Sequence, residues 1–242
     1  MTSQPFNDAL GANYRLQQLI GRGASGEVWY AVDVRTGTPV AAKLLRPEYA
    51  GDPKIVGNFI RERSLLMGLR HPNVVAVQDL VAEGDRLAII MDLVDGGSLR
   101  QGLTEWGPVP AGLALATTAA ILDGLAAAHA QDIAHRDIKP DNVLLSADWG
   151  PAHPDHVRVT DFGISQLLSD SDKSSSGLLG TPLYMSPEYI MTGRTGLPAG
   201  SSRSPASSNQ LAAQVCSTAC RMPPLLRRWQ LPRLPTAARP SR

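Results

Sequence analysis

The sequence predicts an α+β fold, in which a strand-rich N-terminal part precedes a mainly helical part. Residues 14–46 contain three strand-like segments close together, and one amphipathic helix follows them. Residues 110–130 form a long Ala- and Leu-rich segment that is typical of a buried helix. With 242 residues, 43% of them hydrophobic, the chain can bury a full core as one large domain or as two lobes.

The first three strands are expected on either side of a Gly-rich turn. Alternating apolar residues from Tyr14 to Ile20 lead into the turn, and residues 27–32 continue as a second strand. Residues 38–45 give the third strand. Asp52-Pro53 then predicts a helix start, because Asp is a good N-cap and Pro suits the first helical position.

This helix is amphipathic, and His71-Pro72-Asn73 is expected to end it. Its apolar face carries Ile55, Phe59, Glu62, Leu66 and Leu69. Residues 74–80 and 86–92 read as two further strands joined by a turn. Residues 143–145 and 157–160 are expected to flank a short hairpin with a polar insert.

The segment His-Arg-Asp-Ile-Lys-Pro-Asp-Asn at residues 135–142 carries the strongest functional signal. Asn142 follows Asp137 by five residues, and Asp161, the first residue of an Asp-Phe-Gly triplet, follows Asn142 by nineteen. A core does not require such a set, because buried unpaired charges are costly. These offsets are those of the acid set that orients a hydroxyl and holds two magnesium ions for phosphoryl transfer.

Gly21, Gly23 and Gly26 form a Gly-x-Gly-x-x-Gly pattern, which dinucleotide-binding folds share. In those folds a helix follows the glycines, whereas here an alternating strand follows them. Two strands joined by such a turn can lay backbone N–H groups over triphosphate oxygens, where a side chain would obstruct the approach. A plain hairpin turn is the alternative, and it is disfavoured because Lys43 follows Gly26 by seventeen residues.

Lys43 lies mid-strand in Val-Ala-Ala-Lys, where an exposed lysine would be unremarkable. Glu62, however, is a carboxylate on the apolar face of the predicted helix, and a half-buried carboxylate needs a partner. We therefore expect an ion pair that holds Lys43 against the α- and β-phosphates of a nucleotide. Chance placement of Glu62 is the alternative.

Together these motifs resemble those of eukaryotic-type (Hanks-type) protein serine/threonine kinases, in their bacterial, actinobacterial-like form. The resemblance implies a bilobal protein-kinase-like fold. After an N-terminal extension, residues 1–13, an N-lobe of antiparallel sheet plus one helix would span residues 14–94. A mainly helical and incomplete C-lobe would span residues 95–199.

The resemblance also implies ATP and Mg²⁺ as cofactors and assigns catalytic roles. Asp137 would accept or orient the proton of the substrate hydroxyl, and Lys139 would neutralise the migrating phosphoryl group. Asn142 and Asp161 would coordinate magnesium. His135, which alone would suggest an acid/base catalyst, is a packing residue beneath Phe162 in this family.

For the adenine ring, the resemblance implies a sandwich of apolar side chains, a gatekeeper and two hinge residues whose backbone makes hydrogen bonds. These positions are Val28, Ala41, Leu144, the gatekeeper Met91, and the hinge residues Asp92 and Val94. Apart from the hinge backbone, these groups could equally belong to a hydrophobic core.

The expected partner is a protein substrate with a Ser or Thr acceptor, and self-association for autophosphorylation is the first reaction implied. Lys139 together with Gly180-Thr181-Pro182 favours Ser/Thr over Tyr. Arg136 suggests that a phosphate on the activation loop is read by a cationic pocket, and Ser174–Ser176 are placed to carry it. A solvated Ser-rich loop is the alternative for those serines.

The resemblance stops near Ala199, after Ser186-Pro187-Glu188, which matches the family's Ala-Pro-Glu signature with one change. Residues 200–242 contain seven arginines, seven serines, six prolines and no acid. This tail reads either as a disordered basic segment or as an out-of-frame sequence, which we favour. We then expect the helix at 110–130 to lose cover for its apolar side chains Leu113, Ile121 and Leu125. An inactive truncated kinase remnant, or a nucleotide-binding interaction module, is the alternative function.

Charge and cysteine content narrow the remaining classes. Residues 1–199 hold 16 basic and 22 acidic residues, a net charge of −6, and the arginines of the tail lack aromatic interleaving, so nucleic-acid binding is not expected. Neither a signal core nor a continuous run of about eighteen apolar residues is present, so we expect no membrane segment. The two cysteines, Cys216 and Cys220, both lie in the tail and form a poor zinc pair. A cytoplasmic, reducing location is therefore expected.

Overall fold

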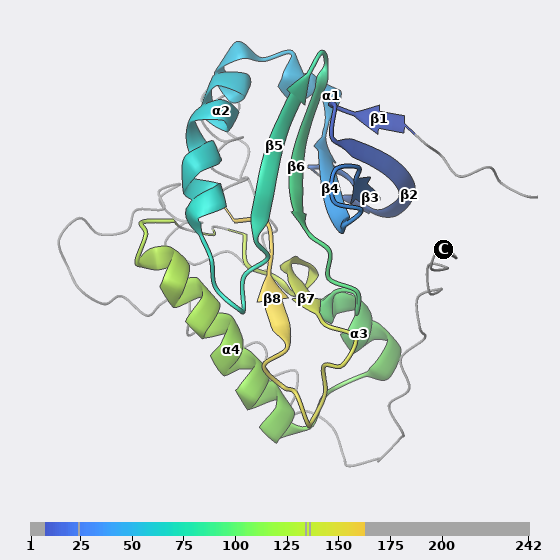
Figure 1. The fold of residues 1–242 in the computed structure, drawn as a ribbon. Helices are drawn as coiled ribbons and strands as arrows, with labels where there is room; N and C mark the ends of the chain where they lie inside the picture. Colours follow the sequence, from blue (N-terminus) through green and yellow to red (C-terminus); the bar gives the residue numbers. More distant parts are fainter. Residues whose placement is uncertain (1–7, 24, 134, 136, 163–242) are drawn as a thin grey trace, which may run out of the picture.

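The computed structural model describes residues 8–23, 25–133, 135 and 137–162, and of residues 61–66 the backbone alone (Figure 1). The larger sheet has six antiparallel strands in the order β1-β2-β3-β4-β6-β5, and β7 and β8 form a separate hairpin. The strands are β1 (Asp8–Leu10), β2 (Tyr14–Gly23), β3 (Gly26–Asp33), β4 (Pro39–Leu45), β5 (Val77–Glu83), β6 (Arg86–Asp92), β7 (Val143–Leu145) and β8 (Val157–Val159).

Four α-helices accompany the strands within the described residues. They are α1 (Pro47–Ala50), α2 (Pro53–Gly68), α3 (Leu99–Trp106) and α4 (Ala111–His129). Helix α2 packs beside β5 in the upper part of the molecule, whereas α4 packs against β8 in the lower part (Figure 1). The α+β arrangement predicted from the sequence, a sheet with one long helix followed by a helical part, is confirmed.

The turn between β2 and β3 is held by Gly26. Its φ angle is +147°, and a Cβ atom there would lie 1.9 Å from the backbone oxygen of Leu44 on β4. Glycine is therefore required by the approach of a neighbouring strand. The register that follows pairs Val28 with Lys43 and, on the next strand, Ala41 with Met91.

Helix α2 begins as the sequence predicts. The Asp52 carboxylate accepts a hydrogen bond of 2.8 Å from the backbone N–H of Lys54, and Pro53 occupies the first helical position. Ile55 and Phe59 are buried at 3% and 1% exposure, in a cluster with β4, β5 and β6. The predicted apolar face is thereby confirmed at these positions.

The strand predicted at residues 74–80 is wrong at its start, because β5 begins at Val77. Residues 73–75 instead pair with the hairpin: the backbone N–H of Val75 donates to the carbonyl of Val159 at 2.9 Å, and that of Val159 donates to Asn73 at 2.8 Å. The side-chain amide of Asn73 donates to the carbonyls of Asp155 and Val157 at 2.7 and 2.9 Å. The segment after α2 therefore anchors the upper part to the lower part.

Helix α3 was not predicted, although Ser98 and Gln101 have the spacing of a capping box in the sequence. The Ser98 side chain accepts from the backbone N–H of Gln101 at 3.2 Å, and the Gln101 side chain accepts from the N–H of Ser98 at 2.8 Å. These reciprocal bonds start the helix immediately after β6 and its short connection.

The expectation that Leu113, Ile121 and Leu125 of α4 lose their cover is wrong. They are 6%, 0% and 6% exposed, and they belong to a cluster that includes residues of β7 and β8. The insert between those strands, predicted to be polar, adds a buried Trp149, whose Nε1–H donates to the Thr117 hydroxyl at 3.1 Å. The hairpin and its insert thus cover the face of α4 that was expected to be bare.

By length and composition, α4 is apolar enough to cross a membrane, although its sequence is not a continuous apolar run. Half of its apolar stretch is buried inside the protein, and core helices of soluble proteins pass the same test. The packing of α4 against the hairpin accounts for its apolar composition.

Candidate active site

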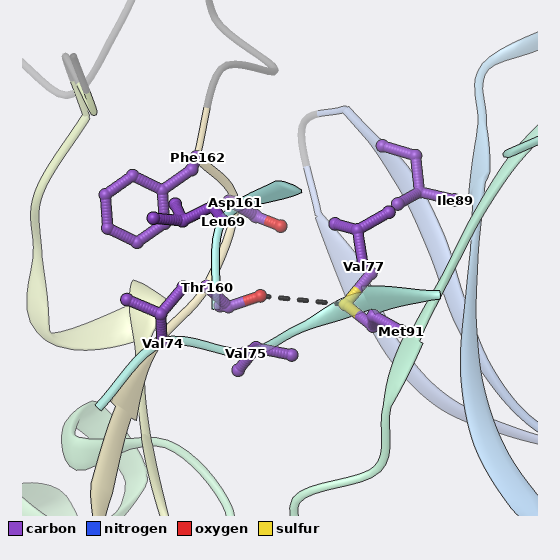
Figure 2. Close-up of a pocket in the computed structure, with 9 residues that line it drawn as sticks. All are labelled: Leu69, Val74, Val75, Val77, Ile89, Met91, Thr160, Asp161 and Phe162. Carbon is purple, nitrogen blue, oxygen red and sulfur yellow. Dashed lines mark hydrogen bonds between the residues drawn. The ribbon is translucent and has the colours of Figure 1, made fainter. Parts of the chain in front are cut away.

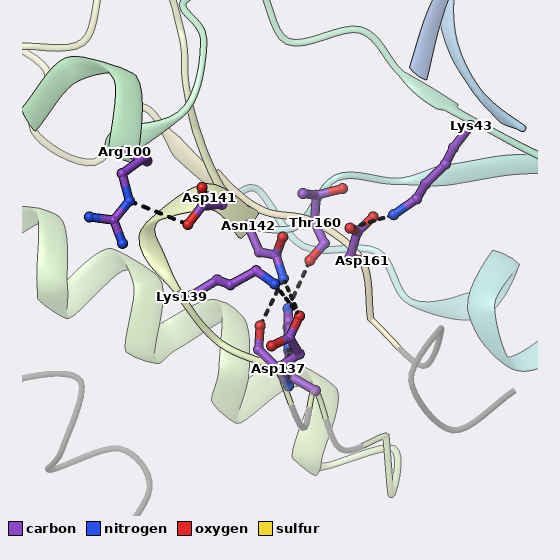
Figure 3. Close-up of polar contacts among 9 residues, drawn as sticks. Lys43, Arg100, Asp137, Lys139, Asp141, Asn142, Thr160 and Asp161 are labelled. Atoms are coloured by element: carbon purple, nitrogen blue, oxygen red, sulfur yellow. Dashed lines mark hydrogen bonds and ion pairs between the residues drawn. The ribbon is translucent and has the colours of Figure 1, made fainter. Parts of the chain in front are cut away.

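The chain from Asp137 to Asn142 folds around the Asp137 carboxylate (Figure 3). Lys139 Nζ lies 2.6 Å from Asp137 Oδ2. The side-chain amide of Asn142 donates to the backbone oxygen of Asp137 at 2.8 Å and to Oδ2 at 3.3 Å. A short 3-10 turn, Pro140–Asn142, makes this return possible within five residues.

Asn142 also connects this loop to the end of the hairpin. Its backbone oxygen accepts from the N–H of Thr160 at 3.0 Å, and its side chain is buried. Since the amide nitrogen of Asn142 is directed at Asp137, the carbonyl oxygen Oδ1 is the end that can bind a cation. Asp161 follows directly after Thr160, so the backbone bond between Thr160 and Asn142 ties the start of the Asp-Phe-Gly triplet to this loop (Figure 3).

Asp161 has a φ angle of +68°, a conformation that L-residues seldom adopt. Its Oδ2 lies 2.5 Å from Nζ of Lys43 on β4. The side chain of Lys43 is only 6% exposed, and a buried ammonium requires a counter-charge, which Asp161 supplies. The predicted partner, Glu62, has a side chain outside the described residues, so the Lys43–Glu62 pair stays a prediction.

His135 is buried between the Asp137 loop and Thr160. Its Nε2 is 2.7 Å from the carbonyl oxygen of Thr160, and its Nδ1 is 3.3 Å from the backbone N–H of Asp137. The first contact requires a proton on Nε2 and the second a lone pair on Nδ1, so these contacts assign the neutral Nε2–H tautomer. Burial lowers the pKa of His135 and favours the same neutral form.

The His135 ring meets the Phe162 ring edge-on, at a centroid distance of 4.7 Å and an angle of 65°. With both nitrogens engaged by backbone groups, the imidazole acts as a packing and hydrogen-bonding support. This agrees with the packing role inferred from the sequence.

Five of the residues predicted to contact adenine lie together where the sheet faces the hairpin. Ala41 and Met91 are buried in one apolar cluster, against which Val28, Val94 and Leu144 pack. Asp92, the last residue of β6, is adjacent to Met91. The segment after β6 is held on β7 by two backbone bonds of 2.9 Å, from Gly96 to Leu145 and from Leu145 to Gly97.

A cavity of about 20 Å³ lies beside Met91, between the sheet and the residues that follow β8 (Figure 2). The Thr160 hydroxyl donates to the Met91 sulfur at 3.7 Å on its wall (Figure 2). The other lining residues are Leu69, Val74, Val75, Val77, Ile89, Asp161 and Phe162. A space of this size holds about one water molecule, so it is a packing gap and does not accommodate a base.

The glycines of the turn differ in what an added Cβ atom would contact. A Cβ atom at Gly21 would make an ordinary 3.8 Å contact with Val28, and one at Gly23 would meet nothing within 4 Å. At these two positions the described protein itself leaves room for a side chain. The need for glycine there would come from a ligand.

Several predicted positions lie outside the described residues: Arg136, Ser174–Ser176, Gly180–Pro182, Ser186–Glu188, residues 1–7 of the N-terminal extension and the whole tail from residue 200. Two charged contacts near the site were missed. Arg100 on α3 reaches Asp141 at 3.4 Å, and Arg158 on β8 reaches Asp92 at 3.2 Å. Single charged residues in an alternating or helical pattern give no signal of such partners.

Comparison with known families gives a match over most of the chain. The model of the protein kinase domain matches residues 14–201. The chain belongs to the protein kinase family. The start of the match coincides with the first residue of the predicted N-lobe, and its end lies two residues beyond Ala199. Members of this family use ATP and a divalent metal ion.

Several curated bacterial proteins are similar to this kinase-family chain. It is 44% identical over 191 residues to the serine/threonine-protein kinase PkaA of Streptomyces coelicolor, which covers 74% of the chain and 35% of PkaA. It is 42% identical over 184 residues to PkaB of the same organism, covering 75% of the chain and 44% of PkaB. The serine/threonine-protein kinase PknL of Mycobacterium tuberculosis is 36% identical over 194 residues, which cover 79% of the chain and 47% of PknL. The chain spans less than half the length of these relatives.

Solved kinase domains share the fold. The crystal structure of the Mycobacterium tuberculosis PknI kinase domain superposes with a TM-score of 0.64 at 27% identity, covering 96% of this chain and 83% of that one. A single-substitution mutant of the same PknI domain gives a TM-score of 0.57 at 29% identity, over 67% of this chain and 64% of that one. These matches confirm the bilobal α+β protein-kinase-like fold predicted from the sequence.

Proposed function

We propose that this kinase-family chain transfers the γ-phosphate of ATP to Ser or Thr hydroxyls of a protein, its own included. The observation that carries the proposal is the Asp137 carboxylate held by Lys139 and Asn142, with Asn142 bonded through its backbone to Thr160, the residue before Asp161. Packing alone gives no reason to gather two carboxylates, an amide and two ammonium groups at one place. The names of the similar bacterial kinases support the same activity.

In this proposal Asp137 binds the substrate hydroxyl and accepts its proton as the oxygen attacks phosphorus. Asn142 fixes the carboxylate through two bonds, to the backbone and to the side chain of Asp137. Lys139, 2.6 Å from the same carboxylate, places its ammonium beside the path of the phosphoryl group. Positioning and charge neutralisation are the main contributions of a protein to phosphoryl transfer.

The donor set also fits a magnesium ion. Oδ1 of Asn142 and the Asp161 carboxylate are hard oxygen ligands, and Mg²⁺ is usually held by one or two protein groups besides phosphates. Bound there, the ion would neutralise charge on the phosphates. Lys43, paired with Asp161 at 2.5 Å, would hold the α- and β-phosphates beside this ion.

For the base, we propose the apolar positions gathered between the sheet and the hairpin. Val28 and Ala41 would lie above the adenine ring, Leu144 below it, and Met91 at its rear. The backbone of Asp92 and Val94 would make the hinge hydrogen bonds. The Gly21–Gly23 part of the turn, where the protein leaves room, would cover the phosphates.

The division into an N-lobe at residues 14–94 and a C-lobe from residue 95, a Ser/Thr-containing protein substrate and a cytoplasmic location stay predictions. Lys139 and the Gly180-Thr181-Pro182 motif support Ser/Thr acceptors. Self-association for autophosphorylation is part of the same proposal.

The test is to incubate the full chain with ATP labelled on the γ-phosphate, Mg²⁺ and peptides that contain Ser, Thr or Tyr. We expect label in the chain and in Ser and Thr peptides, and its loss in Lys43→Met, because Lys43 would hold the α- and β-phosphates. Lys54→Met is the matched control, since Lys54 is an exposed lysine on α2 and should not affect transfer. Transfer that survives Lys43→Met unchanged would contradict the site, and ATP binding without transfer would favour the nucleotide-binding module.

A further inference from the structure

Asp92, at the end of β6, is held from two sides. One carboxylate oxygen, Oδ2, lies 3.2 Å from Nη1 of Arg158 on β8. The other, Oδ1, accepts a hydrogen bond of 2.8 Å from the side-chain amide of Gln78 on β5. The backbone N–H of Asp92 also donates to the carbonyl of Ala76 at 3.0 Å. Neighbours from both the sheet and the hairpin therefore fix this one residue.

Arg158 also has a defined position relative to Leu144, the residue proposed to lie below the adenine ring. In the β7–β8 register, Arg158 is directly opposite Leu144. Directly opposite residues of an antiparallel pair place their side chains on the same face. Leu144 packs against the cluster of Ala41 and Met91, so Arg158 leaves the hairpin on the face that is turned to the sheet.

We propose that Arg158 is a positioning residue of the adenine site: it fixes Asp92, and with it the hinge backbone, relative to Leu144. This rests on the proposed function, in which the hinge backbone reads adenine. The Arg158 side chain thereby connects the hairpin position opposite Leu144 to the hinge at Asp92. The Gln78 bond holds the same carboxylate to the sheet, so the Asp92 side chain cannot follow the hairpin alone.

The Asp92–Arg158 pair is partly shielded from water, with the two side chains 32% and 35% exposed. A pair of this kind contributes modestly, so its loss should weaken binding a few-fold and leave some affinity. The effect should fall on ligands that use the hinge. A nucleotide with the same ribose and triphosphate but a different base edge, such as inosine triphosphate, is the comparison that isolates the hinge contact.

The experiment uses the full chain and measures the dissociation constants of Mg-ATP and Mg-inosine triphosphate by titration calorimetry, with thermal unfolding alongside. Arg158→Met keeps most of the side-chain length and removes the charge, whereas Arg158→Lys retains the charge. Arg86→Met is the matched control. Arg86 also forms a partly exposed pair, with Asp8 at 2.7 Å, and its side chain is 33% exposed.

We expect Arg158→Met to weaken Mg-ATP about fivefold and inosine triphosphate much less, so that the preference for adenine falls. Arg158→Lys should retain part of that preference. Arg86→Met should leave the preference unchanged even where it lowers the melting temperature. The double variant Arg158→Asp/Asp92→Arg should restore part of the preference for ATP. The Gln78 amide can still bond residue 92, because its oxygen can accept from an arginine as its nitrogen now donates to the carboxylate.

If Arg158→Met lowers the affinity for both nucleotides equally, Arg158 contributes stability alone and the proposal is overturned. An unchanged preference for ATP over inosine triphosphate in a folded Arg158→Met would also overturn it. If Arg158→Met does not fold, Gln78→Met removes the other bond to the same carboxylate and must lower the adenine preference. A wild-type chain that binds neither nucleotide would overturn the proposed function itself, an outcome distinct from a wild type that binds ATP and is insensitive to Arg158.

Discussion

Replacing Gly26 by Ala should damage the fold of the N-lobe sheet. The new Cβ would lie 1.9 Å from the Leu44 oxygen and 2.9 Å from the Leu44 carbonyl carbon, both backbone atoms of β4. Because no flexible side chain can move aside, β3 and β4 must separate or the φ angle of +147° must change. A strained backbone conformation costs about 1–3 kcal/mol and overpacking a similar amount, so we expect a loss of about 2–6 kcal/mol.

Gly23→Ala is the matched control, because its Cβ would meet nothing within 4 Å. Its free energy of unfolding should change by less than about 1 kcal/mol. If the turn covers the phosphates, however, the added methyl group should weaken Mg-ATP binding, since glycine there would serve the ligand.

Denaturant unfolding of both variants, with Mg-ATP titration of Gly23→Ala, separates the two roles. A Gly26→Ala chain as stable as the wild type would refute the geometry of the turn. A Gly23→Ala chain that is stable and binds ATP with unchanged affinity would show that this glycine does not serve the phosphates.

Two further predictions concern the lower part of the molecule. Ile121→Ala should cost about 2–5 kcal/mol of unfolding free energy, because Ile121 is 0% exposed, whereas Leu115→Ala, at 59% exposure, should cost little in the same denaturant titration. Burial lowers the pKa of His135 below its ordinary value of 6.5, so the folded chain binds fewer protons than the unfolded chain. Unfolding free energy should therefore fall as the pH drops below about 6.5, by up to about 1.4 kcal/mol per unit from this group. The non-titrating variant His135→Gln should show a flatter dependence, and equal slopes would contradict the buried neutral imidazole.

Local patterns in the sequence predicted much of the fold. Alternation predicted β2, β3, β4 and β6, and Asp52-Pro53 predicted where α2 begins. The offsets between Asp137, Asn142 and Asp161 indicated residues that the structure links through Lys139 and Thr160. These features depend on nearby residues or on fixed chemical spacing, which a single sequence displays.

The failures involve contacts between distant segments. Val74 and Val75 continue a strand-like pattern, yet they pair with β8 instead of joining β5. The polarity of the β7–β8 insert concealed the buried Trp149 and the cover it gives to α4. Arg158 reads as an ordinary surface residue of an alternating strand, because nothing in its own segment points to Asp92.

The most direct test of the central claim, that Asp137 is the group that activates the acceptor hydroxyl, is single-turnover phosphate transfer in Asp137→Asn. The amide retains the size of the side chain and loses its basicity, so transfer should slow by about two to four orders of magnitude. Mg-ATP affinity, measured on the same preparation, should barely change, because Lys43 would hold the phosphates and Asn142 and Asp161 would hold the magnesium ion. Transfer at the wild-type rate, or a parallel collapse of ATP affinity, would contradict the assignment and make Asp137 a structural residue.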